Sequence, residues 1–567
     1  MKRAAILLLV SIASIGASWA AFQALVPEGR PLSRYVPAGS LLYLEAKDFS
    51  ALLAEWSSSP QRAGWVKSKN YEVYSRSRLS LRLEGAGEQF AAAAGLPQDE
   101  NFLTQVAGTH SALALYDIGK LEFLYITKLP SASSMQSALW QTRAKFETRN
   151  AAGLNFYVRR DPESQREVAF AVNGDYLILA TREDLLAGAL ELMAGSQDRS
   201  IEAEQWWSQS VAAGGPVGDL RMVLNLEKIV PSPYFRSYWI QHNITDMKQY
   251  SAAVSDLFLS GADYREERVL LKKSAAAGHA SADDAAAAVA DLARLVPGDT
   301  GTYEVRAGPS ATDCLEVLET KILAPHRGPA IAQRTAPNVP LSSGETGSSS
   351  DLETRIDQAP LKISASSDAP LKELFQKSQV RAVLQVQATE RDKDGVFVRI
   401  HSGVAFLAAA DWPEAAVRSA LVDFLRPSLT TGSLGFEWQP KSGYQEFDGL
   451  WNFAVAVRGK YLLVSDDSTA LRNMFANMNQ KPAQKPAVLV AGFHHARERE
   501  NFARLSGLLD RPNANPGGAP TSEPNPQFFS DNLASFSATL AGVFSETIVV
   551  RDASDKVFQT VTYEWSR

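Results

Sequence analysis

The chain repeats itself, and this feature most constrains how it can fold. Val172–Leu179 has the sequence VNGDYLIL and returns as VRGKYLLV at Val457–Val464. An earlier pair agrees, because Val36–Tyr43 and Val296–Tyr303 both open with Val-Pro and close with tyrosine. The later pair is separated by more residues than the earlier pair, so the second half must contain insertions. We therefore expect two tandem, diverged copies of one module.

Each copy is predicted to be an α+β module, the first over residues 34–273 and the second over residues 294–567. Apolar runs flank Gly174 and Gly459, where glycine can adopt the positive φ of a hairpin turn. These runs are apolar at consecutive positions, which indicates strands that are buried on both faces of a sheet.

Local signals predict further elements in the first copy. A hairpin turn is expected at residues 117–120, and Asp48 is expected to cap a helix. A continuous helix is expected over residues 134–146. Thr181 is expected to cap the helix that ends at Met193, because an acidic residue follows it at the spacing of a capping box.

Three segments interrupt this pattern. Residues 274–293 form an alanine-rich junction between the copies. Residues 325–370 and 511–527 are rich in proline, glycine and small polar residues. Such segments cannot bury enough apolar surface to offset the entropy of ordering them. We expect both to be disordered insertions in the second copy.

Residues 1–26 are predicted to form a membrane segment. Two basic residues precede an uncharged run that extends from Ala4 to Val26. About 20 apolar residues are enough to cross a bilayer, and a basic flank favours the cytoplasmic side. We expect a single-pass anchor in the inner membrane, with the bulk of the chain in the periplasm. The alternative is a secreted chain, because Ser18–Ala20 fits a signal-peptidase site with cleavage near Ala20.

The sequence contains no recognisable catalytic set, and we expect neither a cofactor nor a metal. His494 and Glu498 share one helix face, but no third ligand accompanies them, and a charged, solvent-facing helix is the expected structure. Cys314 is the single cysteine and lies on one face with Leu318 and Ile322, so we expect it in the core. The net charge of −6 gives no sign of nucleic-acid binding.

Aromatic residues are dense in two places of the first copy. Core packing explains such density, but aromatic side chains also anchor interfaces. Our candidate for an apolar contact surface, which would serve a protein, lipid or glycan partner in the envelope, comprises Trp206, Trp207, Tyr234, Phe235, Tyr238 and Trp239.

The membrane segment, the Val-Pro-Ala-Gly-Ser opening at Val36–Ser40 and the Gly-x-Tyr-Leu hairpins at Gly174 and Gly459 together resemble a family of uncharacterised bacterial exported proteins. The family is a domain of unknown function, so the resemblance implies a membrane-anchored location and no activity. We expect a non-enzymatic envelope protein with a binding or scaffold role. The alternative is an envelope hydrolase whose catalytic residues form no known motif.

Overall fold

The computed structural model describes most of the chain. It covers residues 31–96, 101–196, 199–233, 247–260, 263–274, 282–323, 369–391, 398–429, 438–448, 452–481, 486–501 and 542–565. The expected membrane segment at 1–26 and the expected insertion at 511–527 lie outside these residues, as does 325–370 except for its last two residues, which begin a helix. Within the described ranges, no helix is long and apolar enough to cross a membrane.

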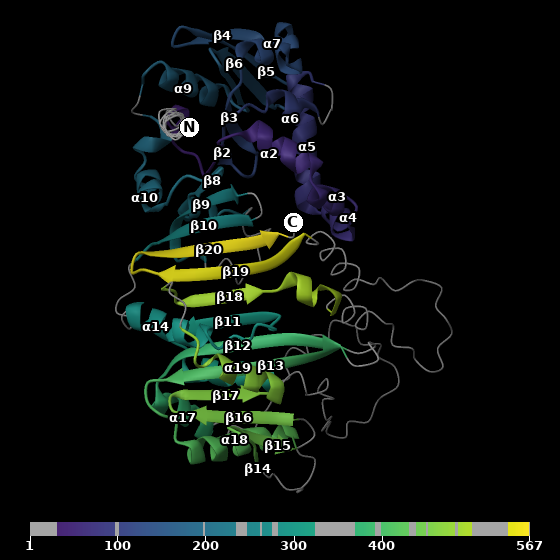
Figure 1. Ribbon diagram of the computed structural model, residues 1–567. Coiled ribbons are helices and arrows are strands. Elements are labelled where there is room, and N and C mark those ends of the chain that lie inside the picture. Colours follow the sequence, from purple (N-terminus) through teal and green to yellow (C-terminus); the bar gives the residue numbers. More distant parts are fainter. Residues whose placement is uncertain are drawn as a thin grey trace, which may run out of the picture. The chain divides into compact units, whose positions relative to one another are not determined.

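The chain divides into two compact units (Figure 1). The first unit comprises Met1–Ser59, Val73–Phe258 and Arg268–Lys273, and the second comprises Pro60–Glu72, Leu259–Glu267 and Ser274–Arg567. Both mix helices with antiparallel strands, which confirms the α+β class. The main division falls between Lys273 and Ser274. Strand β10 (Asp263–Lys272) contributes residues to both units.

The first unit is built on one antiparallel sheet with the strand order β4-β5-β6-β7-β3-β2-β1-β8-β9. Its strands are β1 (Leu42–Ala46), β2 (Ser111–Asp117), β3 (Glu122–Lys128), β4 (Glu147–Ala151), β5 (Leu154–Arg160), β6 (Glu167–Asn173), β7 (Tyr176–Ala180), β8 (Leu220–Leu224) and β9 (Tyr250–Ser260).

Its helices are η1 (Leu32–Tyr35), α2 (Phe49–Ser58), α5 (Arg78–Ala94), α6 (Asn101–Val106), α7 (Ser131–Gln136), α8 (Ala138–Gln141), η2 (Arg143–Lys145), α9 (Glu183–Met193), η3 (Ile201–Ala203), α10 (Gln205–Ala213) and α11 (Leu226–Ile229). Helices α3 (Pro60–Val66) and α4 (Lys69–Ser75) precede α5 in the chain.

Helices cover both faces of the central strands of this sheet. On one face, α9 packs on β3, β6 and β7 through leucines and alanines. On the other face, α5 and α6 lie over the same strands (Figure 1), where aromatic side chains gather. Alternation along β2 explains the two layers: Ala112 and Ala114 belong to the core that contains α9, and Leu113 between them faces the side of α5.

The second unit has the strand order β14-β15-β16-β17-β13-β12-β11-β18-β19-β20, again antiparallel throughout. Its strands are β11 (Thr302–Ala307), β12 (Val380–Arg391), β13 (Val398–Ala408), β14 (Trp438–Pro440), β15 (Gln445–Asp448), β16 (Asn452–Arg458), β17 (Tyr461–Ser465), β18 (Leu489–Phe493), β19 (Val543–Asp552) and β20 (Lys556–Trp565). The helical segments are α14 (Ala282–Ala293), α15 (Ala311–Val317), the π-helical η4 (Leu318–Leu323), α17 (Ala369–Ser378), α18 (Glu414–Leu429) and α19 (Ser468–Asn477).

The expected hairpins are confirmed. Gly174 joins β6 to β7 with φ of 56°, and Gly459 joins β16 to β17 with φ of 55°. Strands β7 and β17 each pair with a neighbour on both sides, so they lie inside their sheets as their apolar sequences predict. Asp48 also caps α2, since its carboxylate accepts a hydrogen bond from the Ala51 amide at 2.9 Å.

Two local predictions are wrong. The helix expected over 134–146 is broken at Ser137, whose hydroxyl donates to the Ser134 carbonyl at 2.6 Å and accepts from the Trp140 amide at 3.3 Å. Ser137 therefore ends α7 and begins α8. Thr181 does not cap α9, because its hydroxyl oxygen accepts a hydrogen bond from the Phe123 amide of β3 at 2.8 Å.

Candidate ligand cavity

A cavity of about 500 Å³ opens in the first unit between the sheet and helices α2, α5 and α6. The strands supply its floor, with Leu44, Ala46, Ser111, Leu113, Leu115, Phe123, Tyr125, Leu179, Thr181 and Leu220. The helices supply its roof, with Phe49, Leu83, Ala86, Gly87, Phe90, Phe102, Leu103 and Val106. Almost all of these side chains are aliphatic or aromatic.

Strand register brings the floor residues together. Leu44 of β1 stands opposite Leu113 of β2, Leu113 opposite Tyr125 of β3, and Tyr125 opposite Leu179 of β7. Residues that are paired directly across antiparallel strands point to the same face of the sheet. This row of four therefore forms a continuous apolar surface under the helices.

Helix α5 forms the roof with one of its faces. Leu83, Ala86, Gly87 and Phe90 recur at the three- and four-residue spacing that places side chains on one side of a helix. The helix begins at Ser77, whose hydroxyl accepts from the Ser80 amide, and ends at Gly95 in the left-handed conformation. A Cβ atom added to Gly87 would have no heavy atom within 4 Å. Gly87 is exposed and lines the cavity, so the roof carries no side chain at this position.

Polar groups inside the cavity are satisfied by the protein itself. The Tyr125 hydroxyl donates to the Val106 carbonyl at 2.9 Å, and the hydroxyls of Ser111 and Thr127 lie 2.6 Å apart. Burial raises the pKa of Tyr125, so this phenol stays neutral. Because these groups already have partners, the interior favours an apolar occupant over a polar one.

The cavity opens to solvent through its helical roof. Leu83 of α5 and Leu103 of α6 line it and are 46% exposed each. Single exposed apolar side chains are ordinary, but here two of them stand at the edge of an apolar cavity.

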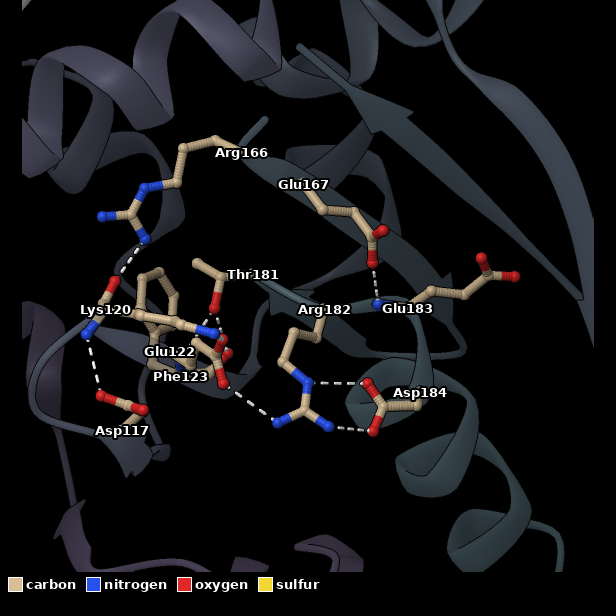
Figure 2. A network of polar contacts seen from close by, with 10 residues as sticks. All are labelled: Asp117, Lys120, Glu122, Phe123, Arg166, Glu167, Thr181, Arg182, Glu183 and Asp184. Carbon is tan, nitrogen blue, oxygen red and sulfur yellow. Dashed lines mark hydrogen bonds and ion pairs between the residues drawn. The ribbon is translucent and has the colours of Figure 1, made fainter. Parts of the chain in front are cut away.

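Charged residues enter the lining at one rim, next to the turn between β2 and β3 (Figure 2). Arg166 and Glu167 are neighbours in sequence, yet their side chains point to different partners. Glu167 accepts from the Glu183 amide at the start of α9 and pairs with Arg160 at 3.1 Å. Arg166 donates through Nε to the Gln89 side chain of α5 at 3.0 Å, and through Nη1 to the Lys120 carbonyl.

The predicted contact surface is only partly described. Trp207 is 5% exposed and packs edge-on against Tyr43 with ring centres 4.9 Å apart, so it belongs to the core and cannot be part of an exposed surface. Trp206 is half-buried and lies against Trp207. The other four residues, Tyr234, Phe235, Tyr238 and Trp239, lie outside the described part of the chain.

Two further sequence predictions have clear outcomes. Cys314 is fully buried beside Leu318 and Ile322, and burial raises the pKa of its thiol to about 12. Glu498 was expected to face solvent but is 1% exposed, where its carboxylate accepts from Arg497 at 2.6 Å and from the Thr389 hydroxyl. The carboxylate is therefore paired inside the protein. Among the residues that the structure describes, no group of potential ligands could hold a metal ion.

Sequence reasoning missed the cavity. The segment Gly85–Phe90 lies in α5, the helix that forms the roof of the cavity. The amphipathic spacing of Leu83, Ala86 and Phe90 indicates a helix that covers an apolar surface, but this spacing is the same over a filled core and over a cavity.

No protein-family model matches the chain, and no curated protein matches it. Among solved structures, crystal forms IV and III of TP0453 are similar to it, each with 10% sequence identity and a TM-score of 0.23. The similar regions cover 42% and 44% of this chain and 80% and 82% of the TP0453 chains. A TM-score this low does not identify a shared fold.

Proposed function

We propose that this protein is a non-catalytic binding protein that holds an aliphatic ligand in the cavity of its first unit. One observation carries the proposal: about 500 Å³ of open space has apolar walls and internally satisfied polar groups. Ligand sites typically occupy about 300–1,000 Å³ and are lined mainly by apolar side chains. An empty cavity of this size is also costly, since its walls lose dispersion contacts, so an occupant stabilises the fold.

The location belongs to the same proposal. The basic start of the chain and the apolar run from Ala4 to Val26 support a single-pass anchor in the inner membrane with the two units in the periplasm. A chain secreted after cleavage near Ala20 would place the same cavity in the same compartment. In both cases the binding protein would work outside the cytoplasm.

The internal duplication is also part of the proposal. The strand order of the first unit, from β4 to β9, matches that of the second, from β14 to β19, strand for strand. Gly174 and Gly459 occupy the equivalent turns with nearly equal φ angles. These matches support two diverged copies of one module, of which the first carries the cavity.

A hydrolase is the weaker candidate. The described lining of the cavity contains one carboxylate, Glu167, and neither histidine nor cysteine. Glu167 is engaged by the Glu183 amide and by Arg160. Nucleophilic catalysis needs a nucleophile within hydrogen-bond reach of a base, and this lining offers no such pair.

Binding can be tested with the neutral dye N-phenyl-1-naphthylamine, which fluoresces when it enters an apolar site. The full chain would be kept soluble with a fluorinated surfactant, because such surfactants mix poorly with hydrocarbon. We expect the wild type to enhance the fluorescence and Gly87→Phe to lose the enhancement, because phenylalanine would occupy the cavity.

Gly85→Phe is the matched control, since a Cβ at Gly85 also has open space but Gly85 does not line the cavity. This variant should keep the enhancement. Equal enhancement by both variants, or none by the wild type, would refute binding in this cavity.

A further inference from the structure

Arg166 holds the one positive charge in the cavity lining. It immediately precedes β6, after a turn in which the Asp161 carboxylate accepts from both the amide and the hydroxyl of Ser164. The Arg166 carbonyl accepts from the Asp161 amide at 2.8 Å, which closes this turn. The turn therefore fixes the backbone from which Arg166 extends to the rim.

The charge of Arg166 is not neutralised by the described residues. Its two acceptors, the Gln89 side chain and the Lys120 carbonyl, are uncharged. A guanidinium has five N–H donors, so these two hydrogen bonds leave donors for a further acceptor. No carboxylate of the described chain lies within ion-pair distance of it.

Neighbouring charges behave differently (Figure 2). Arg182 pairs with Glu122 at 3.0 Å and also with Asp184, and its hydrogen bonds to Asp184 raise the pKa of its guanidinium. Glu167 is engaged by Arg160 and by the start of α9. Of the two charged residues that line the cavity, Arg166 is thus the one that has no counter-ion within the described protein.

The size of the cavity limits the apolar part of the ligand. An engineered apolar cavity of about 150 Å³ binds benzene, so a cavity three times larger has room for roughly twenty carbon atoms. This corresponds to one long aliphatic chain. Two such chains would not fit.

We propose that the ligand is a single-chain amphiphile with an anionic headgroup, whose chain lies between α5 and the sheet and whose headgroup binds Arg166. This assignment rests on the proposed function, since it names the ligand class of the same cavity. A carboxylate or a phosphate matches the forked donors of arginine, and either headgroup would remain at the rim, in contact with water. The apolar interior would take the chain alone.

The test compares cis-parinaric acid, a fluorescent fatty acid, with its methyl ester, at a pH at which the acid is ionised. We expect the wild type to bind the acid more tightly than the ester. Arg166→Gln should weaken acid binding by roughly ten- to a hundredfold, because it removes a hydrogen-bonded ion pair, and should leave ester binding unchanged. Arg166→Lys should retain part of the preference for the acid over the ester, since lysine keeps the positive charge but lacks the paired N–H donors of the guanidinium.

Arg149→Gln is the control, because Arg149 is an exposed arginine of β4 that pairs with Glu147 and does not line the cavity. It changes the net charge equally and should keep the preference for the acid. Competition by palmitate and by a lysophosphatidate would show whether a carboxylate or a phosphate headgroup is preferred, and displacement by either supports the assignment.

Three outcomes separate the two proposals. Equal binding of acid and ester by the wild type and by Arg166→Gln would overturn the headgroup assignment and leave the cavity proposal standing. A two-chain phosphatidate that competes as well as palmitate would overturn the single-chain assignment. Failure of the wild type to bind the acid, the ester and the naphthylamine dye would overturn both proposals.

Discussion

Replacing Gly87 with leucine should stabilise the protein and impair ligand binding at the same time. Gly87 lies in the roof helix α5, lines the cavity, and has open space where a Cβ would be. Gly85 lies in the same helix with equally open space but outside the cavity lining. The pair Gly87→Leu and Gly85→Leu therefore separates the effect of filling the cavity from the effect of removing a helical glycine.

The magnitudes follow from these positions. Glycine in a helix interior costs about 0.5–1 kcal/mol relative to alanine, so both variants gain up to that amount. Full burial of a leucine side chain contributes about 1.5–3 kcal/mol, of which an open cavity provides only part. We expect the free energy of unfolding of the first unit to rise by about 1 kcal/mol in Gly85→Leu and by about 2–3 kcal/mol in Gly87→Leu.

Ligand affinity should change in the opposite direction. The leucine side chain occupies the space of about four ligand methylenes, each worth about 0.8 kcal/mol on burial. The loss of about 3 kcal/mol corresponds to roughly a hundredfold weaker binding. Calorimetric unfolding of ligand-stripped protein and titration with cis-parinaric acid measure the two effects. A Gly87→Leu variant that melts no higher than Gly85→Leu and binds as tightly as the wild type would refute the reasoning.

Four further outcomes are expected. Arg221 and Asp256 form a buried pair with N–O distances of 2.7 and 2.8 Å. Arg221→Ala should therefore lower the free energy of unfolding, measured by chemical denaturation, by about 3–5 kcal/mol. A decrease of less than about 1 kcal/mol would contradict the burial of this pair. Ser137→Ala should lower the free energy of unfolding by about 1 kcal/mol, because α8 loses its N-terminal cap. An unchanged denaturation midpoint would contradict this role. Because burial raises the pKa of the Cys314 thiol from 9.0 to about 12, it should resist a disulfide reagent at pH 8 in the native state and react after unfolding in urea. The contribution of the Cys314 thiol to the free energy of unfolding should be complete below pH 9 and decline as the pH rises toward 12, because the thiol ionises first in the unfolded chain. A Cys314→Ala variant should lack this decline.

The predictions that succeeded depend on short stretches of chain. The hairpin turns at Gly174 and Gly459 need positive φ, and glycine supplies it without help from distant residues. The cap of α2 is equally local, since the Asp48 carboxylate accepts a hydrogen bond from the Ala51 amide within one turn. Burial of Cys314 follows from its helical period with Leu318 and Ile322.

The predictions that failed involve partners distant in sequence. Thr181 has the sequence context of a helix cap, but its hydroxyl bonds to Phe123 on a neighbouring strand. Trp207 has the composition of a contact surface, but Tyr43 covers it. Glu498 has the context of an exposed helix, but the Thr389 hydroxyl lies within hydrogen-bond distance. In each case the sequence specifies the residue type, and the tertiary fold decides its partner.

The cavity could not be predicted for the same reason. Its floor depends on the register of four strands, which aligns Leu44, Leu113, Tyr125 and Leu179 from widely separated segments. Its roof depends on where α5 rests over them. Each strand alone shows only an alternation of apolar residues, which is equally consistent with a filled core.

The most direct test is a crystal structure of the full chain with a fatty acid that carries bromine at the end of its chain. We expect one bromine peak in the anomalous map between α5 and the row of Leu113 and Tyr125, with the carboxylate within hydrogen-bond distance of Arg166. Bromine peaks found only outside this cavity, or side chains of Phe90 and Phe102 collapsed into the space, would contradict the account.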